Sequence, residues 1–452
     1  MEYINKLLTK YKRWLLFGVL LFVALIIRLF LTRFGNFGDV AIFAELGDKF
    51  WKINLHDFYS NRNYYYTYPA YPPLSYYIIA LSYWLYDKRY ILAEIHNIIK
   101  VIPADFIIYF SKPVEKDPLL YGYGYYLLLK LPSILFDLGI SVLVYRIIYK
   151  VTQNYKRAIY GFIFYLFNPL TIFLTSVWGQ NDAVAIFLGM FSIYLLFSKR
   201  ISVSIWLLFL SVYTKPTFII FAPIYLVIFL KLKPQFKNIF LGVIFSAFSF
   251  LILTYPFSGS NYLDFTKKML FENILPGSRG VVRASVSAFN LYSALFTIDK
   301  TQTTFKLLNI PLGLMGIVFF ILINLFVIKR FLLNFKLENI LFSLYIVGLG
   351  NFFFNTGMLE RYFFPAFPFL VILIFIWQKI PIYLIGINII LFLNLIWAFF
   401  RRSVGVIDHL FSDYDFLFIR LLSFANIIFW YFSIKNLLSG KIVYGSRKVI
   451  KF

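Results

Sequence analysis

The sequence has no cysteine, only three histidines and few charged residues. Without cysteine, the chain can form no disulfide, no thiolate nucleophile and no cysteine-ligated metal centre. Charged residues make up 14% of the chain, against about 25% in a typical soluble domain. They are also unbalanced, with 44 lysines and arginines against 20 aspartates and glutamates. These shortages argue against a soluble globular domain.

Apolar residues are abundant instead: 61% of the chain is hydrophobic, 22% is aromatic and the mean hydropathy is +0.77. The sequence lacks the ten-residue alternating pattern of outer-membrane barrel strands. The long apolar runs therefore predict an all-α polytopic membrane protein that forms one domain over residues 1–452. About twelve spans are expected, at 14–31, 125–149, 158–177, 183–197, 201–213, 217–230, 239–255, 307–328, 339–354, 363–377, 381–399 and 416–434.

The basic residues predict the topology of these spans. Four of them, at 6, 10, 12 and 13, precede the first apolar run. That run is long and no small-residue cleavage site follows it, which predicts an uncleaved span with a cytoplasmic N-terminus. The inner loops and termini then hold most of the net charge of +24, as the positive-inside rule expects. The basicity therefore indicates topology, and nucleic-acid binding is not expected.

On this topology a long polar and aromatic loop, 33–124, lies on the outer face. Its segments are an amphipathic helix at 40–53, a tyrosine-rich stretch at 64–74 and two apolar segments at 75–86 and 91–110. Neither of the last two is convincing as a full span, so we expect interfacial or re-entrant helices with aromatic rings at headgroup level. A second outer loop, 257–306, has turn-forming residues around Arg279 and Arg283 and is predicted to act as a partly mobile lid.

Asp39 lies where the chain leaves the first span. Gly35 and Gly38 give the backbone freedom there, so the carboxylate can occupy a cleft. One alternative is that Asp39 simply caps the helix that follows it. The other is that it acts chemically, because further polar residues are expected on the same side of the membrane. Ionisable groups at the ends of spans that face a common cavity are functional candidates.

Several of these outer residues also have structural alternatives. Asn181 or Asp182 could start the next span as a helix cap. Lys215 could extend its ammonium to the interface. Arg361 could pair with Glu360, although adjacent side chains diverge in a helix.

Eight short strings spread along the chain resemble the GT-C glycosyltransferases, polytopic enzymes that use polyprenyl-phosphate sugars. They are Phe37-Gly38-Asp39, Tyr71-Pro72-Pro73-Leu74 and the segments 130–139, 167–169, 178–182, 214–216, 288–291 and 360–362. The sequence is most similar to bacterial and archaeal relatives of GPI mannosyltransferase II, and more distantly to the endoplasmic-reticulum glucosyltransferases that use dolichyl-phosphate glucose. Two departures stand out. Leu359 occupies the place where relatives usually have histidine, and Ala70 replaces an aspartate before Tyr-Pro-Pro.

The resemblance implies a fold, a reaction and a set of site residues. It implies transfer of a hexose, with mannose the first expectation, to a lipid-linked or cell-surface glycan acceptor. The site would lie on the extracytoplasmic face, in a prokaryotic cell membrane. Asp39 would be the catalytic base. Arg361 first, then Lys215, Arg279 and Arg283, would bind the donor phosphate. The residues expected to bind substrate are Tyr71, Trp178, Gln180, Asn181, Asp182, Asn290 and Glu360.

The chemistry of the residues agrees with this reaction. A sugar phosphate carries its own leaving group, so one base and phosphate-binding cations suffice for an inverting displacement, whereas a hydrolase usually needs two carboxylates. No Asp-x-Asp motif is placed for catalysis in an outer loop, so we expect no metal or other cofactor. A lipid or glycan transporter or flippase is the main alternative, although Asp137 is the only acid well inside a predicted span. A membrane acyltransferase or polymerase is a further one, but His56, His96 and His409 fall outside the eight strings.

Overall fold

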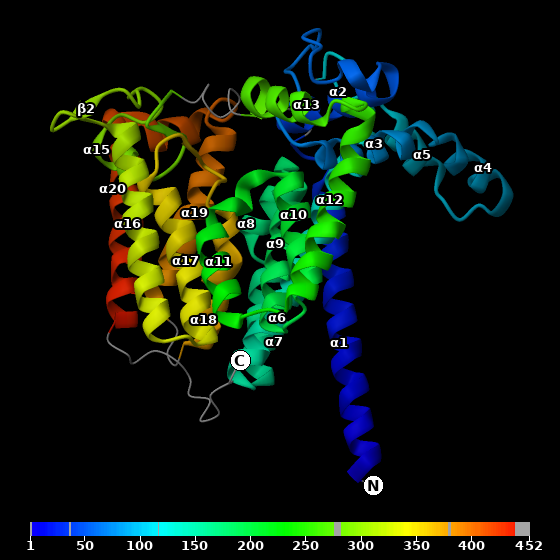
Figure 1. The fold of residues 1–452 in the computed structure, drawn as a ribbon. Coiled ribbons are helices and arrows are strands. Elements are labelled where there is room, and N and C mark those ends of the chain that lie inside the picture. Colours follow the sequence, from blue (N-terminus) through cyan, green and yellow to red (C-terminus); the bar gives the residue numbers. More distant parts are fainter. Residues whose placement is uncertain (1, 36–37, 116, 275–281, 378–380, 439–452) are drawn as a thin grey trace. The chain divides into compact units, whose positions relative to one another are not determined.

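The computed structural model describes residues 2–35, 38–115, 117–274, 282–377 and 381–438. Helices account for nearly all the regular structure in these ranges (Figure 1). The strands found there form two small sheets. Strands β1 (Ser285–Val286) and β4 (Met358–Leu359) pair in parallel, and β2 (Lys306–Leu307) and β3 (Ile310–Pro311) pair antiparallel. The predicted all-α class is therefore confirmed.

Among the described residues, seven helical segments are long and apolar enough to cross a membrane. They are α6 (Tyr123–Thr152), the stretch Tyr155–Trp178, α12 (Phe236–Ser258), α16 (Leu312–Leu333), α17 (Leu337–Phe354), α19 (Ile382–Phe400) and Gly405–Asn436. The stretch Tyr155–Trp178 comprises α7 (Tyr155–Leu166), α8 (Pro169–Ile172) and the π-helix η2 (Phe173–Trp178), and Gly405–Asn436 lies in α20 (Gly405–Leu438). The chain is thus an integral membrane protein with several spans.

Five shorter apolar helices, of 10–17 residues, account for the other five predicted spans. They lie in α1 (Glu2–Leu31), α9 (Asp182–Phe197), α10 (Ile201–Thr214), η3 (Pro216–Phe221) with α11 (Ala222–Leu232), and η5 (Phe364–Ala366) with α18 (Phe367–Ile376). All twelve predicted runs are mainly helical, but the start of 307–328 instead forms the β2–β3 hairpin. Whether the shorter helices cross the bilayer stays a prediction.

Both predicted outer loops contain helices. The first predicted loop contains α2 (Asp39–Lys52), η1 (Leu55–Asp57), α3 (Pro73–Asp87), α4 (Tyr90–Ile99) and α5 (Ala104–Ser111). The second contains α13 (Tyr262–Lys268), the π-helix η4 (Met269–Ile274) and α15 (Leu291–Leu295). The amphipathic helix expected at 40–53 is confirmed as α2, and the segment 91–110 divides into α4 and α5.

The chain divides into two compact units. Unit 1 comprises residues 1–68, 76–142 and 162–184, and unit 2 comprises 69–75, 143–161 and 185–452. Within unit 2, α17 is the most enclosed span, with 83% of its apolar window buried, whereas α12 has only 11% buried. The side chains of α17 therefore pack against protein, and most of those of α12 are available to lipid.

Candidate functional site

Asp39 is the first residue of α2, and Gly38 occupies the N-cap position with a φ of 63°. The turn that leads to it also contains Gly35, with a φ of 66°. Both angles lie in the region that favours glycine, so the expected backbone freedom is confirmed. Because the cap residue is Gly38, Asp39 does not occupy the capping position that the structural alternative requires. Its side chain is partly exposed.

The Asp39 carboxylate meets the segment Trp178–Asp182 within unit 1. Its Oδ2 atom accepts a hydrogen bond from Trp178 Nε1 at 3.2 Å and a shorter one from Gln180 Nε2. Two N–H donors on one oxygen fix the orientation of the carboxylate. The structure thus brings together three residues, 139 and 141 positions apart in sequence, that were predicted separately to belong to the site.

Gly179 allows this close approach. It has a φ of 75°, and a Cβ added there would lie 2.6 Å from Val40 Cγ2 and 2.9 Å from Lys130 Cγ. Any other residue would therefore be strained and would collide with the residue that follows Asp39. The tight turn at Gly179 also ends η2, and π-helical turns are frequent at functional sites.

Two buried amide oxygens of the segment Trp178–Asp182 accept no hydrogen bond from the described part of the chain. They are Gln180 Oε1 and Asn181 Oδ1, and their residues are only 1% and 9% exposed. A buried polar atom normally has a partner, so these two are available to a ligand hydroxyl or to water. Asn181 Oδ1 consequently does not act as the helix cap of the structural alternative. Asp182, the first residue of α9, is buried.

One face of α6 supports both halves of the Asp39 site. Lys130 Nζ donates to three backbone carbonyls, those of Thr32 at 2.9 Å, Phe34 at 2.6 Å and Val177 at 3.1 Å. One turn along, Ser133 Oγ donates to the carbonyl of Gln180. The carbonyls belong to the segments that lead into Asp39 and into Trp178. Lys130 therefore ties together the two segments whose side chains meet at the carboxylate.

The same face of α6 carries Asp137, one turn beyond Ser133. Its Oδ2 pairs with Arg28 Nη2 of α1 at 2.8 Å, and both side chains are completely buried. Its Oδ1 accepts from the Tyr165 hydroxyl at 2.8 Å, and Arg28 Nη2 also donates to Thr171 Oγ1 at 3.4 Å. Neither this network nor the contacts of Lys130 were predicted, although the segment 130–139 is one of the eight strings. The other indication in the sequence was that isolated charges occur inside otherwise apolar spans.

Other carboxylates of unit 1 hold the tyrosine-rich loop. Glu45 accepts from the backbone N–H groups of Tyr65 at 2.5 Å and Tyr66 at 2.9 Å. Asp117 accepts from the hydroxyls of Tyr66 at 2.9 Å and Tyr126 at 2.8 Å. Burial, followed by the hydrogen bond to Asp117, raises the pKa of Tyr66 above its usual value. Both carboxylates are 2% exposed, so they are less accessible than Asp39.

Unit 2 contains the predicted phosphate-binding residues. Lys215 is 5% exposed, and its Nζ lies 5.1 Å from the centre of the Tyr71 ring. It is therefore buried against an aromatic ring and does not extend outward as the structural alternative expected. Arg361 Nη1 pairs with Glu360 Oε1 at 2.6 Å. The prediction that the side chains of Glu360 and Arg361 diverge was wrong, because the two residues follow strand β4 in a turn and do not belong to a helix.

The remaining predicted residues lie along the second outer loop. Asn290 is completely buried, and its Oδ1 caps α15 by accepting from the N–H groups of Tyr292 and Ser293. Arg283 is exposed and forms an isolated β-bridge with Gln302. Arg279 lies outside the described residues. Asn290 therefore has a structural function that needs no ligand, and the phosphate role of the arginines stays a prediction.

The described part of the predicted lid is attached to unit 2 at several points. Thr303 N–H donates to the Val282 carbonyl at 2.7 Å. Asp299 forms a salt bridge with Arg401, whose Nη2 donates to Ser287 Oγ at 2.8 Å. Any closing movement by residues 282–303 would have to carry these contacts along or break them. The predicted mobility itself stays untested.

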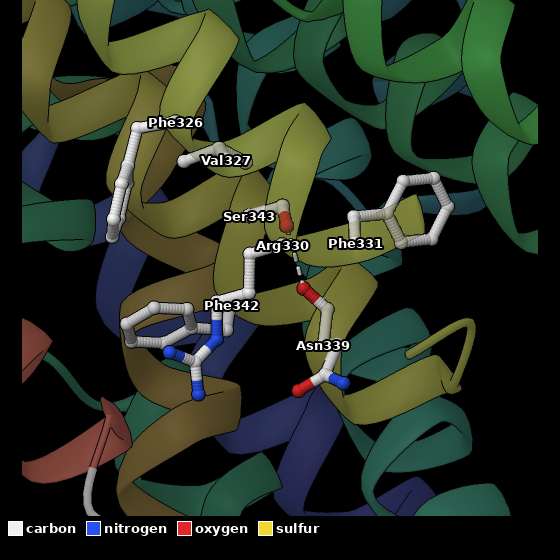
Figure 2. A pocket seen from close by; sticks show the side chains of 7 residues that line it. All are labelled: Phe326, Val327, Arg330, Phe331, Asn339, Phe342 and Ser343. Atoms are coloured by element: carbon white, nitrogen blue, oxygen red, sulfur yellow. Dashed lines mark hydrogen bonds between the residues drawn. The ribbon is translucent and has the colours of Figure 1, made fainter. Parts of the chain in front are cut away.

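A small pocket in unit 2 contains none of the predicted site residues (Figure 2). It lies between the end of α16 and the start of α17, and its lining residues are Phe326, Val327, Arg330, Phe331, Asn339, Phe342 and Ser343. Its free volume is about 10 Å³, room for about one water molecule. The Ser343 hydroxyl donates to the Asn339 carbonyl at 2.7 Å beside it. The pocket is too small for a sugar.

Comparison with known proteins does not assign this chain to a family. A scan against models of protein families finds no match, and a search of curated proteins finds no similar sequence. In the ranges that the structure describes, no group of three or more histidine, aspartate or glutamate side chains is placed to hold a metal ion. The candidate site therefore has to be interpreted from its own geometry.

Proposed function

We propose that this protein is an integral-membrane glycosyltransferase of the GT-C type. It transfers a hexose, mannose in first place, from a polyprenyl-phosphate sugar to a lipid-linked or surface glycan acceptor. The acceptor hydroxyl attacks the anomeric carbon, the bond to the phosphate oxygen breaks, and Asp39 takes the hydroxyl proton. Polyprenyl phosphate leaves with the bonding electrons, and the anomeric configuration inverts.

The observation that carries this proposal is the setting of Asp39. The carboxylate is partly exposed, and Trp178 and Gln180 fix its orientation. A positioned carboxylate of this kind suits general-base catalysis. The acceptor oxygens of Gln180 and Asn181 add capacity to bind the O–H groups of a polyol. An inverting transfer needs no second carboxylate, because phosphate is already a good leaving group.

The buried acid inside α6 favours an enzyme over a transporter. A transporter that uses ionisable groups near the bilayer midplane needs them to change partners or protonation during its cycle. Asp137 instead pairs with Arg28 and accepts a further hydrogen bond from Tyr165. Because both carboxylate oxygens of Asp137 already have protein partners, its ion pair with Arg28 has the character of a structural contact.

A donor screen tests the proposal directly. The purified chain in lipid nanodiscs would be given polyprenyl-phosphate mannose, glucose or arabinose together with a lipid-linked glycan acceptor. We expect release of polyprenyl phosphate and an inverted product with one donor, most readily mannose. Movement of an intact donor lipid across vesicles, with the phosphate–sugar bond unbroken, would instead indicate a transporter.

The phosphate assignment is tested at Arg361. We expect Arg361→Lys to weaken donor binding, because the charge remains but the planar fork for bidentate phosphate contact is lost. Arg361→Ala should weaken it further. Titration of each variant with a polyprenyl-phosphate sugar gives the affinity, and a thermal melt shows whether loss of the Glu360 pair unfolds the protein.

Arg420→Lys is a matched control, because Arg420 also pairs with a nearby carboxylate, that of Asp415 at 2.7 Å. It should leave donor affinity unchanged. If both Arg361 variants bind donor as the unmodified protein does, Arg361 serves only its pair with Glu360, and the phosphate site lies elsewhere.

A further inference from the structure

The helices α4 and α5 form a hairpin whose side chains are left largely uncovered by the described chain. No residue of α4 is buried, and in α5 only Phe110 is. The most exposed apolar side chains lie around the turn between the two helices and in α5: Ile98 is 80% exposed, Ile99 58%, Val101 72% and Ile108 67%. Soluble proteins rarely leave such contiguous apolar surface in water, so something covers it.

The base of the hairpin lies beside the start of the apolar helix α6, in unit 1. The Tyr109 ring of α5 stacks on that of Tyr123, the first residue of the span α6, with centroids 5.0 Å apart. Tyr123 N–H also donates to the Lys112 carbonyl just after α5, at 3.0 Å.

This attachment places the hairpin at the N-terminal end of α6, a helix long and apolar enough to cross a membrane. The helices contain 10 and 8 residues, or about 15 and 12 Å at 1.5 Å per residue, too short to cross a hydrocarbon core of about 30 Å. Aromatic and cationic residues accompany the apolar ones, as is usual at headgroup level. Tyr90 is 54% exposed, and Lys100 is exposed at the turn after α4.

We propose that the α4–α5 hairpin binds the phospholipid bilayer as an interfacial anchor, with Ile98, Ile99, Val101 and Ile108 inserted at the boundary of headgroups and acyl chains. Lys100 faces the lipid phosphates. A bilayer is the occupant that the structure favours, because the hairpin is attached to the first residue of α6, a helix long and apolar enough to cross one. The inference needs no transferase activity and stands independently of the proposed reaction.

The absence of cysteine from the chain makes the test direct. Single-cysteine variants Ile98→Cys and Ile108→Cys would carry an environment-sensitive fluorophore in phosphatidylcholine–phosphatidylglycerol nanodiscs. Both positions are exposed, so the substitutions should not disturb folding. Asn63→Cys is the control, because Asn63 is an exposed polar residue of the same unit. Nitroxide lipids labelled near the headgroup or near the end of the acyl chain then quench according to depth.

We expect blue-shifted emission from labels at Ile98 and Ile108, and stronger quenching by the shallow nitroxide than by the deep one. The Asn63 label should emit as it does in water. Water-like emission at both hairpin positions would overturn the proposal. So would stronger quenching by the deep nitroxide, which indicates a re-entrant segment. A blue shift without lipid quenching, or self-quenching that rises with protein density, would mean that protein covers the hairpin and would also overturn it.

Discussion

Asp39→Asn is expected to lower the rate of sugar transfer by about 10²–10⁴-fold, the usual effect of losing one positioned base. The amide oxygen of asparagine can still accept hydrogen bonds from Trp178 and Gln180, as the Oδ2 atom of Asp39 does. Its nitrogen, however, cannot take a proton from the acceptor hydroxyl at neutral pH. The loss should therefore appear in kcat, while donor affinity stays close to that of the unmodified protein.

The measurement is single-turnover transfer from the donor that the screen identifies, with a thermal melt to show that the variant is folded. Asp87→Asn is the control, because Asp87 is a surface carboxylate of the same unit, 53% exposed and paired with Lys88. It should transfer sugar at the normal rate. Near-normal turnover by folded Asp39→Asn protein would remove Asp39 from the mechanism.

Much of the helical structure could be predicted from local sequence pattern. A long apolar run specifies a helix whatever its neighbours are, because a backbone in lipid must satisfy its own hydrogen bonds. The break in the last helix was not predicted. The predicted run begins at Phe416, whereas α20 begins at Gly405 and breaks over Asp413–Phe416, where three of the four residues have positive φ. The segment 307–311 was misassigned because its apolar residues resemble the start of a span.

The candidate site was predictable only in part. Asp39 and the segment Trp178–Asp182 each follow an apolar run, so topology alone put them on one side. The contacts of Lys130 were not predictable, because a lysine inside a span has no sequence-local partner. It reaches backbone carbonyls 96, 98 and 47 residues away, and helix periodicity does not say which helices are neighbours. The Glu360–Arg361 pair was misjudged because the turn after β4 was taken for a helix.

The buried pair of Arg28 and Asp137 supports a second strong prediction, on stability. Both side chains are fully buried, and their nitrogen and oxygen atoms lie 2.8 Å apart. Removing one partner leaves the other charge without compensation, which typically costs about 3–5 kcal/mol. We therefore expect Asp137→Asn and Arg28→Met each to lower the free energy of unfolding by about that amount. By contrast, Asp87→Asn, at an exposed pair, should change it by less than about 0.5 kcal/mol.

The double variant Arg28→Met with Asp137→Asn separates the charge effect from simple loss of packing. Both charges are then gone, so no uncompensated group stays buried, and the protein should recover most of the stability lost in the single variants. Unfolding in detergent micelles, followed by circular dichroism, measures all four proteins of the cycle. If the single variants unfold like Asp87→Asn, or if the double variant loses the sum of both single losses, the pair does not stabilise unit 1. In that case α6 would hold the Asp39 site through the hydrogen bonds that Lys130 and Ser133 donate to backbone carbonyls, and not through the ion pair of Asp137.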